Sequence, residues 1–270
     1  MKIPKLIHRI WTNKMSMPEV ILDNIRDVAS SNPGWRQKIY TDDDINDYVS
    51  RHYGPEISRA MNSISPKYAV CRADLFRYLV VYREGGVYLD AKSSLKGPLE
   101  ELIQPDDEFL LSQWGSFGQE MFSGYGSWKE LRHIPGGEYH QWHIISIPEH
   151  PFLKAVITNV LNNISNYNPW KVGAGQRGVL RMTGPIAYSM AIQPIRTMYP
   201  HRVIDLKDSI LLYSAFDPNS HRNLGGIHYT ALHEPIIAST QIADRIFSVF
   251  HNLQQKTLWK LNKIRQRVLQ

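Results

Sequence analysis

Hydrophobic and polar residues along the first 50 positions follow the order strand, helix, strand, helix. Residues 3–12 and 35–41 are short apolar segments bounded by polar or turn residues, which is typical of β-strands. Between them, residues 18–30 place apolar side chains at helical spacing, and Thr41 supplies an N-cap for a second helix. This alternation predicts an α/β domain with a mainly parallel sheet flanked by helices, in which ligands bind at the carboxyl ends of the strands.

The longest internal helix is predicted over residues 65–83, and Gly85-Gly86 ends it. Residues 87–92 then alternate like a strand, which places Tyr88, Asp90 and Lys92 on one face. The remaining pattern predicts strands at 108–113 and 143–147, helices at 151–164 and 185–198, and short strands around Val203 and Leu211.

The net charge of +6 is concentrated at the carboxyl end of the chain. Residues 244–270 hold six Lys and Arg residues against the single acidic residue Asp244, and their apolar positions recur at helical spacing. We therefore divide the chain into a domain at 1–243 and a basic amphipathic helix at 244–270. Such a helix suits an anionic membrane surface; docking on the domain or pairing with another subunit are the alternatives.

Sequence composition also limits the cellular location and the partners that we expect for the protein. The first residues lack the apolar centre of a secretory signal, and no segment approaches the roughly 18 apolar residues that cross a bilayer. We therefore expect a cytoplasmic protein. If the tail binds a membrane, the protein would be peripheral at the inner face of that membrane. The single cysteine, Cys71, lies in an apolar helical pattern and is predicted to be buried. No nucleic-acid motif accompanies the basic tail, and nucleic acid is not expected as a partner.

Two neighbouring stretches carry a more specific signal. ADLFRY at residues 73–78, followed by GGVYLD at residues 85–90, resembles the sugar-binding region of DXD-containing glycosyltransferases. The chain is identified by this resemblance as similar to glycosyltransferase family 32, which includes initiating α-1,6-mannosyltransferases, and more distantly to the glucosyltransferase domain of large clostridial toxins. Three other stretches resemble the same family: PKLIHRIW at 4–11, QW at 141–142 with PEHPFL at 148–153, and RMTGP at 181–185.

The resemblance implies a GT-A fold and transfer of a hexose, with retention, from a UDP- or GDP-sugar to a saccharide or lipid-linked glycan acceptor. A bacterial surface polysaccharide or lipopolysaccharide pathway is the expected setting. Trp11 is expected to stack on the nucleotide base, and Asp74 and Arg77 to hold the hydroxyls of the donor sugar. The donor-binding residues that the resemblance implies are Ile10, Trp11, Arg72, Asp74, Arg77, Tyr88, Asp90, Gln141, Thr183, Gly184 and His228.

Some of these assignments have structural alternatives. Asp74 and Arg77, three residues apart, would also suit a surface ion pair, and Arg72 would also suit a position facing solvent. Tyr88 fits a packed core tyrosine equally well. The acceptor is expected near residues 114–128, where glycines permit motion and aromatic side chains suit sugar faces; a plain surface loop is the alternative.

The chain departs from the family motif at position 92. The second aspartate of the motif binds Mn²⁺ or Mg²⁺, whereas this chain has Lys92 there. One carboxylate and one ammonium sum to zero formal charge, as do two carboxylates and a divalent cation, so Lys92 can neutralise a leaving diphosphate in place of a metal. We take Asp90 and Lys92 as the catalytic residues and favour metal independence. The alternative keeps a metal on Asp90 with help from His228.

Two rival functions follow from the same residues. Loss of the second aspartate is also what a catalytically inactive sugar-nucleotide or glycan-binding protein of this fold would show. In the other rival, the basic tail makes the chain a peripheral membrane scaffold. Both rivals predict no turnover of any donor.

Overall fold

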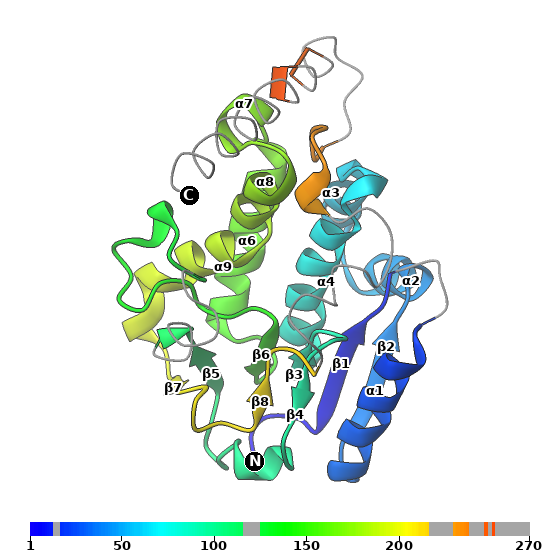
Figure 1. Ribbon diagram of the computed structural model, residues 1–270, viewed down its shortest axis with the longest axis vertical. Helices are drawn as coiled ribbons and strands as arrows, with labels where there is room; N and C mark the ends of the chain where they lie inside the picture. The colour runs from blue at the N-terminus through cyan, green and yellow to red at the C-terminus, as the bar shows by residue number, and fades with distance from the viewer. Residues whose placement is uncertain (13–16, 116–124, 216–228, 238–245, 248–249, 252–270) are drawn as a thin grey trace, which may run out of the picture.

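A six-stranded sheet forms the centre of the fold (Figure 1). The computed structural model describes residues 1–12, 17–115, 125–215, 229–237, 246–247 and 250–251. The strands of the main sheet are β1 (Leu6–Ile10), β2 (Arg36–Tyr40), β3 (Gly86–Leu89), β5 (Phe109–Ser112), β6 (His143–Ser146) and β7 (Arg202–Ile204). Their order is β2-β1-β3-β6-β5-β7, and β4 (Ser94–Leu95) pairs separately with β8 (Leu211–Leu212).

The directions of the strands show at which edge of the sheet most of their carboxyl ends lie. β1 is parallel to β2 and β3, β5 is parallel to β7, and β6 is antiparallel to both of its neighbours. Five strands therefore end at one edge, and β6 begins there. This confirms the predicted α/β class with a mainly parallel sheet.

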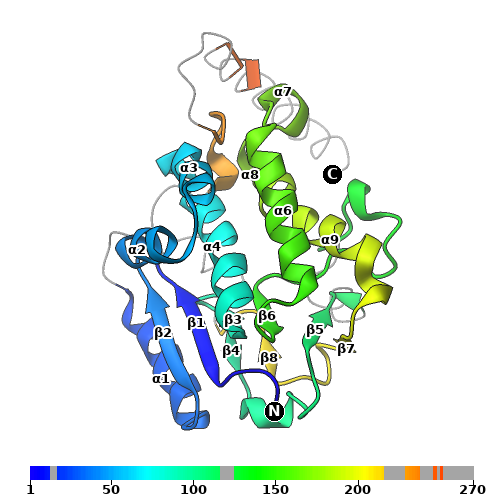
Figure 2. The same cartoon turned by 180° about the vertical axis from the view of Figure 1, so that it is seen from behind.

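Helices and the small sheet cover the two faces. The helices are α1 (Glu19–Ser31), α2 (Asp42–His52), α3 (Pro55–Ser63), α4 (Ala69–Glu84), α6 (Pro151–Ser165), α7 (Pro169–Val172), α8 (Gly175–Met182) and α9 (Pro185–Ile192). Figure 2 shows α4 and α6 side by side on one face, and their apolar side chains share a core cluster with Tyr88 and Ile144 of the sheet. On the other face Val87, Leu89 and Ile145 pack with α1 and the β4–β8 pair.

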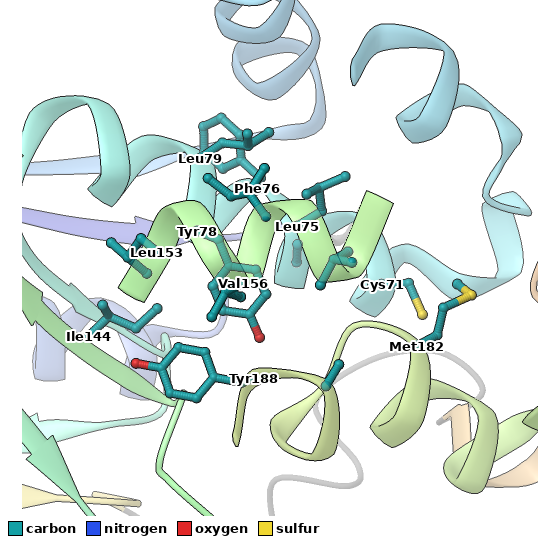
Figure 3. Close-up of a cluster of buried hydrophobic side chains, with 14 of the residues drawn as sticks. Cys71, Leu75, Phe76, Tyr78, Leu79, Ile144, Leu153, Val156, Met182 and Tyr188 are labelled. Carbon is teal, nitrogen blue, oxygen red and sulfur yellow. The ribbon is translucent and has the colours of Figure 1, made fainter. Parts of the chain in front are cut away.

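The longest helix, α4, passes through the middle of the larger core. Cys71, Leu75, Phe76, Tyr78 and Leu79 are buried and meet side chains of α6, α9 and β6 (Figure 3). Burial on both sides of the helix explains why its apolar positions extend beyond a single stripe. The prediction that Cys71 is buried is confirmed.

Two glycines turn the chain from α4 into β3. Gly85 and Gly86 have φ values of +66° and +93°, and a Cβ atom at Gly86 would lie 2.6 Å from the carbonyl oxygen of Leu6. Only glycine fits such a backbone so close to another strand. The helix therefore ends at Glu84, one residue after the predicted end, and β3 begins beside β1.

Most predicted elements occur within a few residues of their expected bounds, and three differences are informative. β3 ends at Leu89 rather than at Lys92, and residues 91–92 form a turn. The expected helix at 185–198 is split into α9 and a 3₁₀ helix, Gln193–Met198, with Pro194 near its start. The helices α3 and α8 have short apolar patterns that the sequence analysis did not recognise.

The predicted carboxyl-terminal helix lies almost entirely outside the described residues, so its division from residues 1–243 stays a prediction. Within it the structure describes Ile246, Phe247, Phe250 and His251. Across the described part of the chain, no helix combines the length and apolarity that a membrane span requires.

The core around α4 gives the first testable prediction. Leu75 is fully buried, and Leu75→Ala should lower the free energy of unfolding by about 2–5 kcal/mol, because the cavity it leaves is enclosed by rigid neighbours. Val20 on α1 is 46 % exposed, and Val20→Ala is the control that should change stability little. Urea unfolding followed by circular dichroism measures both. Equal losses for the two variants would contradict the assigned core.

Candidate active site

A cavity of about 560 Å³ opens at the edge of the sheet where the parallel strands end. The turn after β3 contributes Asp90 and Lys92, and the segment after β5 contributes Trp114. Because β6 runs in the opposite direction, the residues that precede it, Gln141 and Trp142, reach the same edge. Side chains of α4 and the helical pair α8 and α9 complete the walls. This is the place where open α/β sheets bind ligands.

A buried arginine shapes the turn that carries Asp90 and Lys92. Arg9 of β1 is fully buried, and its Nη1 donates to the carbonyl oxygens of Asp90 at 3.0 Å, Ala91 at 3.3 Å and Ser93 at 3.0 Å. The Nδ2 atom of Asn24 donates to the Ser93 oxygen at 2.9 Å. These hydrogen bonds turn the carbonyl groups toward Arg9 and Asn24, and the chain therefore leaves the strand after Leu89. That is the physical reason why β3 is shorter than the alternation predicts.

A second buried arginine joins the two carboxylates of the site. Arg77 on α4 contacts Asp74 at 3.0 Å through Nη2 and Asp90 at 3.1 Å through Nη1, and it also donates to the carbonyl oxygen of Gln141 at 3.0 Å. Burial lowers the pKa of the Arg77 guanidinium, but nearby Tyr88, Asp90 and Asp74 raise that pKa by more. Arg77 therefore stays protonated and fixes the spacing of both carboxylates.

The ion pair of Asp74 and Arg77 is buried rather than on the surface. Their side chains are 2 % and 7 % exposed, and both line the cavity. Asp74 also accepts a hydrogen bond of 2.8 Å from the Thr183 hydroxyl, which lies directly before α9. The surface-pair alternative is therefore wrong. A carboxylate oxygen accepts more than one hydrogen bond, so Asp74 keeps capacity for a ligand hydroxyl.

Hydrogen bonds join Tyr78, Gln141 and Thr183 at the edge of the cavity near Asp74. The Tyr78 hydroxyl contacts the carbonyl oxygen of Thr183 at 2.7 Å and the side chain of Gln141. Gln141 and Gly184 line the cavity, whereas Thr183 lies behind it and is fully buried. The RMTGP segment thus meets the QW segment through α4.

Lys92 reaches the cavity from the turn after β3. Its Nζ atom lies 2.9 Å from the Tyr213 hydroxyl and 4.1 Å from the centre of the same ring. Burial lowers the pKa of Lys92, while attraction to Asp90 opposes that shift. Hence a cation and a carboxylate share the cavity at the position of the family motif. Tyr213, 121 positions further along the chain, has no local sequence signal that would associate it with this site.

The residues around Asp90 do not fit a divalent cation. Its Oδ1 atom already accepts 2.9 Å from the Tyr88 hydroxyl and pairs with Arg77, and the ammonium of Lys92 stands where the motif has its second carboxylate. Mn²⁺ and Mg²⁺ bind to oxygen ligands such as carboxylates and phosphates, and an ammonium beside Asp90 repels a cation there. Within the described ranges no group of three or more His, Cys, Asp or Glu side chains is arranged to hold a metal ion. His228, the second suggested ligand, lies outside the described residues.

The far wall of the cavity holds a carboxylate that the sequence analysis did not identify. Glu138 is 7 % exposed and accepts hydrogen bonds from the indole nitrogen of Trp114, at 2.7 Å, and from that of Trp128. Burial raises the pKa of Glu138, and the two indole donors oppose the shift. Within the predicted acceptor segment, residues 116–124 lie outside the described part of the chain.

Several predicted donor-binding residues do not line the cavity. Arg72 turns the other way and donates to the carbonyl oxygen of Met61 at 3.0 Å and to Asn46 at 2.7 Å. Ile10 is buried in the core, and Trp11, directly after β1, is partly buried. Tyr88 is 2 % exposed and packs in the core, where its hydroxyl donates to Asp90 and the guanidinium of Arg77 lies 4.7 Å from the centre of its ring.

Known proteins resemble this chain in fold. The solved structure described as PaToxG Glycosyltransferase aligns with a TM-score of 0.51 at 16 % identity and covers 73 % of this chain and 71 % of that one. The fold is therefore that of GT-A glycosyltransferases, and the expectation drawn from the sequence is confirmed.

Part of the chain matches a known family of sequences. Residues 18–110 match the model of the glycosyltransferase sugar-binding region containing DXD motif, a range that includes Asp74, Arg77 and Asp90. This part of the chain therefore resembles the sugar-binding region of DXD-containing glycosyltransferases.

Curated relatives match a larger part of the chain. Inositol phosphoceramide mannosyltransferase 1 of Schizosaccharomyces pombe is 25 % identical over 173 residues, which cover 62 % of this chain and 44 % of the relative. Initiation-specific alpha-1,6-mannosyltransferase of Candida albicans is 27 % identical over 167 residues, covering 58 % and 42 %. The chain thus spans less than half the length of these relatives. The resemblance to initiating α-1,6-mannosyltransferases is confirmed.

The bridging guanidinium gives the second prediction. Arg77→Met should lower the free energy of unfolding by about 3–5 kcal/mol, because it leaves two carboxylates close together without a cation. Arg51 forms an exposed pair with Asp47, and Arg51→Met serves as the control that should not lower stability measurably. Adding Asp74→Asn to Arg77→Met should recover part of the loss in urea unfolding. No difference between the Arg77 and Arg51 variants would contradict the bridge.

Proposed function

We propose that the chain is a retaining glycosyltransferase that moves a hexose from a UDP- or GDP-sugar to a hydroxyl of a saccharide or lipid-linked glycan. The setting that we propose is bacterial surface polysaccharide or lipopolysaccharide synthesis. The observation that carries the proposal is the buried Asp74–Arg77–Asp90 bridge, which lines a cavity at the ligand-binding edge of the sheet.

The chemistry of the charged half of the cavity supports a donor sugar there. The carboxylate of Asp74 accepts hydrogen bonds and the guanidinium of Arg77 donates them, so the pair suits adjacent sugar hydroxyls, which do both. Both side chains are held by buried partners, and binding a sugar therefore costs little further ordering. The two relatives described above are both named as mannosyltransferases, which supports a hexose donor.

We propose that Lys92 supplies the positive charge that a leaving diphosphate needs. In the transfer, the bond from the anomeric carbon to the diphosphate breaks, and a bond from the acceptor oxygen forms on the same face of the sugar. The acceptor proton passes to the departing diphosphate oxygen. An ammonium in a partly desolvated cavity stabilises the developing negative charge more than it would in water.

Donor use by the purified protein tests the function itself. A panel of UDP- and GDP-sugars with saccharide acceptors is incubated with and without EDTA, and released UDP or GDP is measured. Turnover of at least one donor is expected. The absence of turnover with every donor, together with retained donor binding by calorimetry, would favour the inactive binding protein instead.

Position 92 gives the third prediction. Activity of the wild type should persist in EDTA, and Lys92→Met should lower kcat by about 10²- to 10³-fold, because one stabilising group for the leaving diphosphate is lost. Lys92→Asp should make the residual activity dependent on added Mn²⁺, because it restores the second carboxylate. Lys96→Met, which changes an exposed lysine of the same segment, is the control. Loss of wild-type activity in EDTA and its return with Mn²⁺ would overturn the role of Lys92.

We further propose a cytoplasmic protein that meets an anionic membrane surface through residues 244–270. Six basic residues and a helical apolar pattern support this placement, which would bring a lipid-linked acceptor to the enzyme.

The fourth prediction concerns this tail. The full chain should float with vesicles that contain about 30 % anionic lipid, whereas residues 1–243 should float less, because the basic face is removed. Vesicles of neutral lipid should bind neither form. Flotation that is equal for both forms on anionic vesicles would exclude the tail as the membrane contact.

A further inference from the structure

The cavity has two chemically different halves. Its cationic lining residues, Arg77 and Lys92, lie with Asp74 and Asp90 on the side of α4 and β3. The opposite half is aromatic, and among its described lining residues Glu138 is the charged one; the aromatic residues are Trp114, Tyr125, Trp128 and Trp142. Tyr213 lies between the two halves, where it contacts both Lys92 and Trp142. A diphosphate needs cations, so it suits the first half. An array of ring faces suits the apolar C–H face of a saccharide.

Glu138 connects two of these rings from separate parts of the chain. Its Oε1 atom accepts from Trp114, which follows β5, and its Oε2 atom accepts from Trp128, which precedes the 3₁₀ helix Lys129–Leu131. Indole has a single N–H donor, and each one is directed at a different oxygen of the same carboxylate. The carboxylate therefore sets the orientation of both rings at once.

Close packing leaves this arrangement little freedom. Gly126 has a φ of +75°, and a Cβ atom there would lie 2.6 Å from Trp114 and 3.0 Å from the Cγ atom of Glu138. Trp114 also packs edge-on against His140, with ring centres 4.4 Å apart. The indole of Trp114 is thus confined by a backbone turn on one side and a ring on another.

We propose that Glu138 is the positioning residue of an acceptor subsite, in which it holds Trp114 and Trp128 as walls for the face of an acceptor saccharide. This proposal rests on the proposed function and deepens it. The acceptor hydroxyl is thereby presented to the donor sugar held at the Asp74–Arg77–Asp90 end of the same cavity.

The test separates acceptor binding from donor binding and from stability. Glu138→Gln keeps the shape of the side chain but turns an amide N–H donor toward one of the indole N–H donors, which should displace that ring. The acceptor KM should rise at least about tenfold. The dissociation constant of the donor and its hydrolysis without acceptor should stay at wild-type values. Glu130→Gln, the same change at a residue paired with Arg181, is the matched control.

A second variant distinguishes positioning from simple structural damage. Trp128→Phe keeps an aromatic face without the N–H donor, so Glu138→Gln combined with Trp128→Phe should recover most of the acceptor KM that Glu138→Gln loses. Equal changes in acceptor KM and donor affinity, or no recovery in the double variant, would reduce Glu138 to a structural residue and overturn the proposal.

Direct binding keeps the subsite testable apart from turnover. Methyl glycosides of mannose, glucose and galactose are titrated into the wild type and into Glu138→Gln, and binding is followed by saturation-transfer NMR. Signal with the wild type and its loss in Glu138→Gln support the subsite. Absence of signal with the wild type for every glycoside would overturn it. Failure of the proposed function would instead appear as absence of donor binding and hydrolysis in the wild type.

Discussion

The site depends on one buried guanidinium. Arg77 holds Asp74 and Asp90 through separate nitrogen atoms, and water reaches little of the Arg77 and Asp74 side chains. Burying a charge is costly unless it is paired, so the three groups remain together or the local structure fails. The same bridge ties the middle of α4 to the end of β3. This one bridge therefore contributes to the packing of the core, to the position of the turn that carries the motif and to the charge of the cavity.

The direction of β6 explains how residues far apart in sequence meet at this bridge. In a purely parallel sheet the residues before β6 would lie at the opposite edge, away from Asp90. Because β6 is antiparallel, the segment that contains Glu138, Gln141 and Trp142 arrives at the edge where β3 and β5 end. The antiparallel direction of β6 therefore brings the aromatic half of the cavity next to the charged half. The proposed active site follows from this strand order as well as from the sequence motif.

Periodicity along the sequence predicted the α/β class, and the resemblance to the family singled out Asp74, Arg77, Asp90 and Lys92, which line the cavity. The sequence did not predict Arg9, whose role is to gather carbonyl groups 81 to 84 positions away, nor Tyr213 beneath the ammonium of Lys92. These contacts depend on strand order, which local patterns do not encode. Arg72 shares a helix with Arg77, yet it faces Met61 and Asn46 because five residues turn a helix well past a full rotation.

The central claim is that the buried bridge holds a donor sugar while Lys92 neutralises its diphosphate. A crystal structure of the protein with an intact, non-transferable donor, grown in the presence of Mn²⁺, tests that claim most directly. The account predicts sugar hydroxyls within hydrogen-bond distance of Asp74 and Arg77, and the Nζ atom of Lys92 beside a phosphate oxygen. Anomalous scattering from Mn²⁺ between Asp90 and the diphosphate, with Lys92 turned away, would contradict it.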